Sequence, residues 1–283
     1  MPLLNLTSTK AILETMGHSP QKKLGQNFLV DANITRKSLA LAQVQAKDRI
    51  VEIGPGLGTL TRALLETGAH VYAVERDPTL YSYLKREIAP HHSNLSLMYG
   101  DAVEHPLAQI KPEHGPFKIV ANLPYAITSP WMDAVLEHDL PTVLSLMLQE
   151  EAADRLCAKP GTKSIGALTI DVALAFEKVG LHRVPAQCFY PPPAVGSVLL
   201  VLKKREQPHR LSKTTRSTIR FCFTQRRKQI GALLRKCPEP VISENAHGLL
   251  NETRIDPTTR PEAVTVHQWR TFDRLVDRLK LPD

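Results

Sequence analysis

Residues 50–58 read Ile-Val-Glu-Ile-Gly-Pro-Gly-Leu-Gly, and this stretch decides the predicted fold of the 283-residue chain. The mostly apolar run from Ile50 to Ile53 is typical of a buried strand, and three glycines follow it directly. Residues 59–66 then carry apolar side chains at helical spacing. A strand, a glycine turn and a helix in this order predict the nucleotide-binding opening of a doubly wound α/β sheet.

The spacing of the glycines separates two classes of cofactor. The dinucleotide fingerprint G-x-G-x-x-G would need a glycine at Thr59, whereas here the third glycine is Gly58. The shorter G-x-G-x-G spacing resembles the loop that holds S-adenosylmethionine, a cofactor without phosphate. We therefore expect S-adenosylmethionine and disfavour a nicotinamide oxidoreductase. For the loop taken alone, a purely structural turn is the alternative.

Polar residues also end the next predicted strands. The strand 71–74 leads into Glu75, the strand 95–99 leads into Asp101 after one glycine, and a fourth strand ends in Asn122. Ligands in open α/β sheets bind outside the carboxyl ends of the strands, so we expect these side chains to share one site. Glu75 is placed to accept hydrogen bonds from both ribose hydroxyls of a nucleoside, and Asp101 from the amine of an adenine ring.

Asn122-Leu123-Pro124-Tyr125 combines a side-chain amide, backbone carbonyls and an aromatic ring. The amide oxygen of Asn122 and the carbonyl of Leu123 or Pro124 are suitable acceptors for the two N–H groups of an exocyclic amine. Such acceptors draw the amine toward a tetrahedral geometry in which its lone pair attacks an electrophile. Tyr125 is placed to stack on the base. These four residues are the catalytic candidates, and an ordinary Asn-x-Pro turn is the alternative.

Charge divides the chain near residue 205. Residues 1–202 carry 18 Lys and Arg against 19 Asp and Glu, whereas residues 203–283 carry 18 against 9. A concentrated basic segment favours a nucleic-acid partner over a merely solvated helix face. Helical spacing predicts one apolar stripe along residues 219–234, edged by an outward-facing row of Arg216, Arg220 and Arg227. A capping box at residues 265–268 predicts a final helix with Val266, Trp269, Phe272, Val276 and Leu279 inward.

The motifs together resemble those of the KsgA-type ribosomal RNA adenine dimethyltransferases, over nearly the full chain. The matching segments are Gln26–Asp31, Val51–Gly58, Glu75, Gly100-Asp101, Asn122–Tyr125, Phe189–Ser197 and Phe223–Lys228. The family pattern in the proline-rich loop ends Val-Asp-Ser, so Gly196 departs from it. This departure concerns a local turn interaction and not the fold.

The resemblance implies a doubly wound, Rossmann-like S-adenosylmethionine-dependent methyltransferase domain over residues 1–205 and a small all-helical RNA-binding domain over residues 206–283. It implies that S-adenosylmethionine contacts Asn27, Leu29, Gly54, Gly56, Glu75, Asp101 and Asn122. The expected walls of the target-base pocket are Phe28, Tyr125 and Phe189. The expected RNA contacts are Arg216, Arg220, Arg226, Arg227 and Lys228.

The resemblance also implies the reaction: dimethylation of the exocyclic amines of two adjacent adenines near the 3′ end of 16S small-subunit rRNA, in the immature 30S subunit. One rival is a DNA adenine methyltransferase, in which position 123 is often proline where this chain has Leu123. Another is an antibiotic-resistance enzyme acting on large-subunit RNA, which residues 205–283 resemble less well. A third is a non-catalytic ribosome-assembly or transcription factor, against which the intact Gly54, Glu75, Asp101 and Asn122 argue.

The composition of the chain indicates the cellular compartment in which we expect the protein. The apolar stretches fall short of the ~20 residues that a membrane span needs, and the start of the sequence shows no signal-peptide pattern. The four cysteines form no C-x-x-C, and the 11 histidines show no zinc spacing. We therefore expect a cytoplasmic protein with reduced thiols, no bound metal and no membrane contact. Nothing in the sequence demands more than a monomer.

Overall fold

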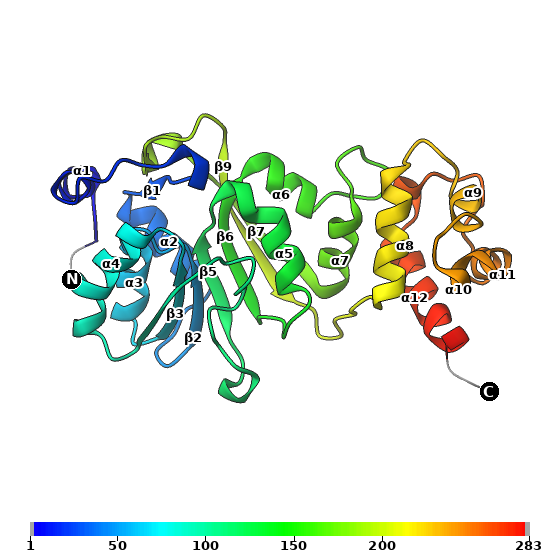
Figure 1. Ribbon diagram of the computed structural model, residues 1–283, viewed down its shortest axis with the longest axis horizontal. Helices are drawn as coiled ribbons and strands as arrows, with labels where there is room; N and C mark the ends of the chain where they lie inside the picture. The colour runs from blue at the N-terminus through cyan, green and yellow to red at the C-terminus, as the bar shows by residue number, and fades with distance from the viewer. Residues whose placement is uncertain (1–2, 281–283) are drawn as a thin grey trace. The chain divides into compact units, whose positions relative to one another are not determined.

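The computed structural model describes residues 3–280 and divides into two compact units. The sheet unit comprises Met1–Ala153 and Lys178–Lys204, and the helical unit comprises Asp154–Glu177 and Arg205–Asp283. Figure 1 follows the chain by colour from its blue start to its red end.

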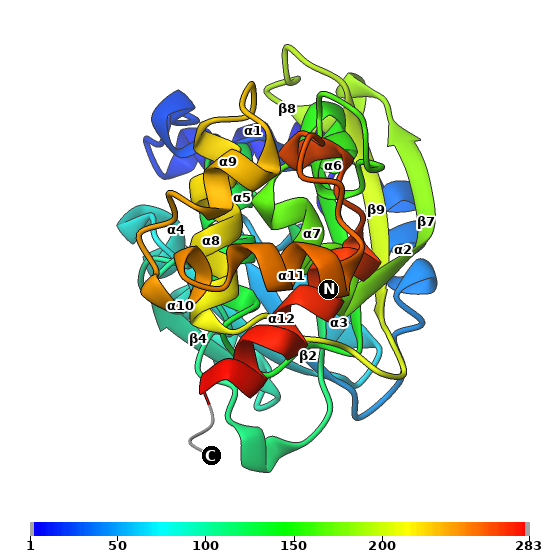
Figure 2. The same cartoon turned by 90° about the vertical axis from the view of Figure 1, so that its right-hand side faces the viewer.

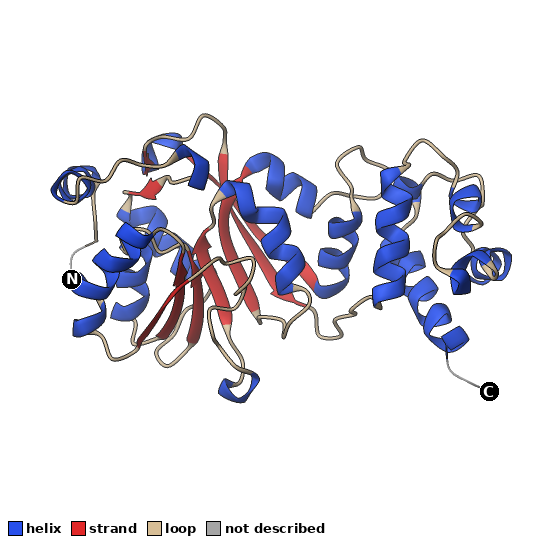
Figure 3. Ribbon diagram, viewed as in Figure 1, coloured by secondary structure: helices blue, strands red, loops and turns tan. Residues whose placement is uncertain are grey.

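A seven-stranded sheet forms the centre of the sheet unit, in the order β4-β3-β2-β5-β6-β9-β7 (red in Figure 3). Five strands are parallel: β2 (Arg49–Ile53), β3 (His70–Glu75), β4 (Leu95–Tyr99), β5 (Lys118–Asn122) and β6 (Val143–Gln149). β9 (Ser197–Lys204) runs antiparallel to β6, and β7 (Phe176–Val184) lies at the edge. The strand order reverses between β2 and β5, where ligand crevices open in such sheets. The doubly wound α/β fold is thus confirmed.

The helices of the sheet unit begin where the sequence supplies caps. Asp31 and Asp77 each accept two backbone N–H groups, at the starts of α2 and α4 respectively. α3 instead begins after Gly58, whose φ of +81° is open to glycine and strained for other residues. The bounds are α1 (Leu6–Thr15), α2 (Ala32–Leu41), α3 (Thr59–Glu66), α4 (Pro78–Glu87), α5 (Thr128–Val135) and α6 (Glu150–Leu156).

Short elements complete the unit. β1 (Phe28–Leu29) and β8 (Phe189–Tyr190) pair antiparallel, with Phe28 opposite Tyr190 and Leu29 opposite Phe189. The 3₁₀ turns are η1 (Lys22–Leu24), η2 (Ala89–His91), η3 (Pro112–His114), η4 (Tyr125–Ile127) and η5 (Ala186–Cys188). A core cluster that includes Ile50, Leu64, Val71, Leu84 and Val120 is fully buried and fixes the strands whose ends carry the site.

The helical unit contains only helices among residues 205–280, as the sequence predicts. α12 contacts α7, α8, α10 and α11 (Figure 2), and its Trp269, Phe272 and Val276 are fully buried. The bounds are α7 (Ala167–Ala175), α8 (Lys213–Thr224), α9 (Ile230–Leu234), α10 (Pro240–Ser243), α11 (Ala246–Thr253), η6 (Pro261–Ala263) and α12 (Val266–Lys280).

The predicted boundary near residue 205 misses two earlier crossings of the chain, after Ala153 and after Glu177. Residues 154–177, which the sequence analysis places in the first domain, belong to the helical unit. Ile170 and Leu174 of α7 pack in the core of that unit, and Asp171 pairs with Arg216 of α8. α7 carries one charged residue, so no change in charge marks these crossings in the sequence.

Two further helix predictions need correction. The apolar stripe of residues 219–234 lies on two helices, because α8 ends at Thr224 and α9 begins at Ile230. The predicted capping box of α12 is present: the Thr265 N–H donates to Gln268 Oε1 at 2.9 Å, and the Gln268 N–H to Thr265 Oγ1 at 3.2 Å. Leu279, however, is 46% exposed, so the apolar face of α12 is covered only as far as Val276.

Within residues 3–280, none of the helices has the length and apolar character needed to span a membrane.

Candidate functional site

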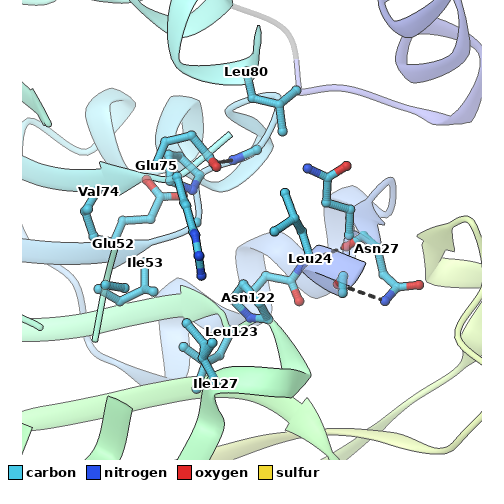
Figure 4. Close-up of a pocket in the computed structure, with 18 of the residues that line it drawn as sticks. Leu24, Asn27, Glu52, Ile53, Val74, Glu75, Leu80, Asn122, Leu123 and Ile127 are labelled. Atoms are coloured by element: carbon cyan, nitrogen blue, oxygen red, sulfur yellow. Dashed lines mark hydrogen bonds between the residues drawn. The ribbon is translucent and has the colours of Figure 1, made fainter. Parts of the chain in front are cut away.

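A pocket in the sheet unit lies outside the carboxyl ends of β2, β3, β4 and β5. In Figure 4, Glu52 and Glu75 lie on one side of it and Asn27 on the other, with Asn122 between them. All seven expected cofactor contacts line this pocket: Asn27, Leu29, Gly54, Gly56, Glu75, Asp101 and Asn122. Phe28 lines it too, as do the other three catalytic candidates, Leu123, Pro124 and Tyr125. The structure therefore brings together residues that lie far apart in the sequence.

The glycine loop lies directly against the Asn122–Tyr125 segment. Gly54 has φ +63°, and a Cβ built there would stand 3.3 Å from Pro124 Cγ. Any side chain at this position would push the loop and the catalytic candidates apart. Gly54 thus permits the close approach of two motifs that the sequence shows only separately.

Glu75 is buried and firmly held. Its Oε2 accepts the Gly56 N–H at 3.0 Å, and its Oε1 accepts the Asp77 N–H at 2.8 Å. Burial raises the pKa of the Glu75 carboxyl, and the two backbone N–H groups oppose that shift. Each carboxylate oxygen has a second lone pair, so the group can still accept hydrogen bonds from a ligand.

Glu52 is a second buried carboxyl in the pocket, and sequence reasoning missed it. The side chain is 1% exposed, and its Oε2 has no hydrogen-bond partner within residues 3–280. Burial raises the pKa of Glu52 from 4.5 to about 8; interaction with Thr61 opposes this shift, and the nearby Glu75 charge adds to it. Its place inside an apolar strand, immediately before the glycine loop, was the signal that could have found it.

Asp101 lies at the end of β4 with both oxygens engaged. Its Oδ1 accepts the Val103 N–H at 2.8 Å, and its Oδ2 lies 2.9 Å from Arg76 Nη1. Arg76 also lines the pocket and is another residue that sequence reasoning did not select. A hydrogen bond donated by an adenine amine to Asp101 therefore has to use a remaining lone pair of a carboxylate already fixed from two sides.

Asn122 is oriented by the segment that precedes β1. Its Nδ2 donates to the Asn27 carbonyl at 2.8 Å, and no described residue donates to its Oδ1. Because the amide is planar, anchoring the nitrogen fixes the direction of the oxygen. This oxygen is thus an acceptor whose direction is fixed before a ligand binds; its role in polarising an amine stays a prediction.

Tyr125 is held at its hydroxyl. The Tyr125 Oη lies 2.6 Å from Ser197 Oγ of β9, and burial raises the pKa of the phenol. The phenol therefore stays neutral at physiological pH, with its ring at the pocket. Phe28, 6% exposed, packs beside Gly56.

Phe189 does not line the cofactor pocket, and its place in the wall of the target-base pocket stays a prediction. It is 2% exposed and packs with Leu29, Ile34, Met147 and Leu199. Successive side chains of a strand point to opposite faces, and in β8 the inward position falls on Phe189. The next residue, Tyr190, is less buried, with Lys10 Nζ 5.2 Å from its ring centroid.

The expected RNA contacts divide into inward and outward residues. Arg216 is 11% exposed with its Nε 3.4 Å from Asp171 Oδ2, so it does not face outward. Arg226 donates to the Lys163 carbonyl at 2.9 Å and lies over the Phe223 ring. Arg220, Arg227 and Lys228 are exposed. The predicted outward-facing row of arginines does not form, because α8 ends before Arg227 and buries the face that carries Arg216.

A family model for ribosomal RNA adenine dimethylase matches residues 17–272. The chain belongs to this family. Ribosomal RNA small subunit methyltransferase A of Opitutus terrae is 51% identical to this dimethylase over 275 residues, covering 96% of this chain and 98% of the relative. The protein of the same name in Magnetococcus marinus is 38% identical over 266 residues, covering 92% and 93%.

Solved structures agree with this membership. A dimethyladenosine transferase from Plasmodium falciparum is similar to this dimethylase with a TM-score of 0.74 and 25% identity, covering 90% of this chain and 98% of that one. The 23S rRNA methyltransferase ErmE follows with a TM-score of 0.64 and 26% identity, covering 89% and 100%. The protein is therefore an adenine methyltransferase of this family, and its methyl donor is S-adenosylmethionine.

The pocket of the dimethylase fits that cofactor. S-adenosylmethionine carries positive charge on its sulfonium and ammonium groups, and the pocket presents two buried carboxyls, one with an unpartnered oxygen. Buried polar atoms without partners are uncommon in folded proteins. A bound molecule with N–H donors would give the Glu52 Oε2 the partner it lacks, and positive charge on that molecule would favour the ionised carboxylate.

Proposed function

We propose that this protein dimethylates the exocyclic amines of two adjacent adenines near the 3′ end of small-subunit rRNA, in the immature 30S subunit. The observation that carries the proposal is the Asn122 amide, whose nitrogen is anchored on the Asn27 carbonyl at 2.8 Å while its oxygen is left to accept from a ligand. The relatives named for the small subunit support this choice of RNA.

Asn122 and its neighbours prepare the amine for attack. The Asn122 Oδ1 and the carbonyl of Leu123 or Pro124 accept the two N–H groups, so the lone pair leaves conjugation with the ring. Tyr125, held by Ser197, presents its ring for stacking on the base. When bound, S-adenosylmethionine supplies a methyl group already activated on a sulfonium. No strong base is needed beforehand, because the proton leaves after the amine becomes cationic.

The cofactor is held from the opposite side of the pocket. Glu75 would accept the ribose hydroxyls, Asp101 the adenine amine, and Asn27, Leu29, Gly54 and Gly56 would line the remainder. Because Glu75 is fixed by two backbone N–H groups, these contacts need little rearrangement of the protein.

The RNA surface is revised by the structure. We assign phosphate contacts to the exposed Arg220, Arg227 and Lys228 and remove Arg216 and Arg226 from that role. Arginine pairs phosphate oxygens bidentately and stays charged. We further infer a monomeric, cytoplasmic enzyme.

The test compares wild type with Asn122→Ala, using labelled S-adenosylmethionine and immature small subunits. Wild type should label small-subunit RNA and leave large-subunit RNA and DNA unlabelled. Asn122→Ala should bind RNA normally but lose turnover by roughly a hundredfold, as loss of a preorganised polar contact does elsewhere. Labelling of large-subunit RNA instead would favour the resistance-type activity. Cofactor binding without transfer to any RNA would favour an assembly factor.

A further inference from the structure

The segment 18–27, here named the strap, joins α1 to β1 and covers one side of the cofactor pocket. Its residues 23–27 line the pocket. Within residues 3–280, the backbone of residues 19–27 makes no backbone hydrogen bond to the sheet. Between its ends, the strap is therefore held to the sheet unit by hydrogen bonds that involve side chains.

One end of the strap is tied beside the catalytic candidates. The Asn27 carbonyl accepts from Asn122 Nδ2 at 2.8 Å. Gly25 approaches the same segment, and a Cβ built there would stand 3.5 Å from the Tyr125 amide nitrogen. Movement of the strap would therefore move the group that orients Asn122.

The strap is also tied to Asp77, through residues along its whole length. Its Oδ2 accepts Gln21 Nε2 at 3.0 Å and Gln26 Nε2 at 2.9 Å, and His18 Nε2 lies 3.7 Å away. The Gln26 Oε1 in turn accepts the Gln21 N–H at 2.8 Å. One carboxylate oxygen thus gathers side chains from three places in the strap.

Asp77 itself is fixed independently of the strap. Its side chain is 1% exposed. Its Oδ1 caps α4 through the Thr79 and Leu80 N–H groups, and its own N–H donates to Glu75 Oε1 at 2.8 Å. Asp77 therefore connects the strap to the carboxylate assigned to the cofactor ribose.

We propose that Asp77 is a positioning residue that latches the strap over the cofactor pocket, and that this latch sets how fast S-adenosylmethionine enters and leaves. The role of the strap in cofactor exchange rests on the proposed function. The latch consists of amide-to-carboxylate hydrogen bonds that water can replace, so the strap can open at modest cost.

The sharpest variant is Gln21→Glu. Gln21 is exposed and does not line the pocket, so the change leaves the cofactor contacts and the cap of α4 in place. It sets a second carboxylate against Asp77 Oδ2, where an amide now donates at 3.0 Å. Gln45→Glu makes the same charge change at another exposed position and serves as the control.

Three measurements are made on the full chain. Amide hydrogen exchange of residues 18–27 in the cofactor-free protein should speed up about tenfold in Gln21→Glu, the effect of about one lost charged hydrogen bond. The dissociation rate constant of S-adenosylmethionine should rise by about the same factor. Single-turnover methyl transfer at saturating cofactor should change less than about twofold. Gln45→Glu should behave as wild type.

Asp77→Asn is a second test variant for the same measurements. Asparagine still caps a helix, but it places an amide nitrogen against the two glutamine amides. It should reproduce the faster exchange and dissociation. Unchanged exchange of residues 18–27 in both variants, or unchanged dissociation, would overturn the latch. If wild type fails to bind S-adenosylmethionine at all, the proposed function fails, while the exchange measurement on the cofactor-free protein still decides whether Asp77 holds the strap.

Discussion

At the scale of single residues, the pocket depends on two buried carboxyls with different tasks. Glu75 has two backbone donors, whereas the Glu52 Oε2 has no partner among the described residues. The first is ready to bind a ligand, and the second is costly to ionise in the ligand-free protein. The two residues therefore give separate predictions.

Replacement of Glu75 should weaken cofactor binding and also cost stability. Glu75→Ala would remove the two charged hydrogen bonds proposed to the ribose, each worth about 1.5–3 kcal/mol, so affinity should fall at least about tenfold. It also leaves the Gly56 and Asp77 N–H groups without their acceptor, so the melting temperature should fall. Calorimetry well below the melting temperature checks the affinity, and an unchanged value would remove Glu75 from the ribose site.

Replacement of Glu52 should stabilise the ligand-free protein. The folded chain keeps the Glu52 proton up to a pKa of about 8, whereas the unfolded chain loses it near 4.5. The free energy of unfolding therefore decreases as pH rises through this window. Glu52→Gln should gain stability that grows across the window, reaching a few kcal/mol above it. Denaturant unfolding at several pH values checks this, with the exposed Glu104→Gln as control; parallel pH profiles for Glu52→Gln and wild type would contradict it.

At the scale of elements, the glycine loop shows what sequence spacing can and cannot predict. The strand 50–53, the helix 59–66 and the polar strand ends follow from local patterns, and the structure has them. The contact of Gly54 with Pro124 and the unpartnered Glu52 Oε2 depend on how the described segments pack, which no local pattern encodes. Arg216 was misplaced because a motif gives the residue type but not the face that the fold buries.

The third glycine of the loop should be the least tolerant of substitution. Gly58→Ala forces φ +81° on an L-residue and brings its Cβ against Ile88 Cδ1. We expect a loss of roughly 1–3 kcal/mol or more. Gly248→Ala is the matched control, because it lies in α11 with nothing near its Cβ, and should gain about 0.5–1 kcal/mol. Chemical denaturation of both variants measures the contrast; equal stabilities would show that the α3 start adapts.

At the scale of the whole molecule, the basic residues of the helical unit fall into two groups. Some are exposed and are expected to affect RNA binding, whereas Arg216 is expected to affect stability. Neutralising Arg220, Arg227 and Lys228 with Gln should weaken RNA binding and leave cofactor affinity unchanged. Each lost phosphate contact should remove about 0.7–0.9 from the slope of log affinity against log salt. Arg216→Gln should instead leave Asp171, which is 4% exposed, without this charge partner and lower the melting temperature. A triple variant with the wild-type salt slope would show that these side chains do not meet RNA.

The division of the chain between its units has a consequence for biosynthesis. The helical unit takes its first helix from residues 154–177, and the chain then returns to the sheet unit for residues 178–204 before supplying the rest. During translation α7 thus emerges well before α8 and α12, with Ile170 and Leu174 lacking their eventual neighbours. The sheet strands can pair in that interval, whereas the helical core cannot be completed until α12 has been synthesised. A gene cut at residue 205 would therefore yield two incomplete pieces, and swaps between relatives should exchange residues 154–177 together with the carboxyl-terminal part.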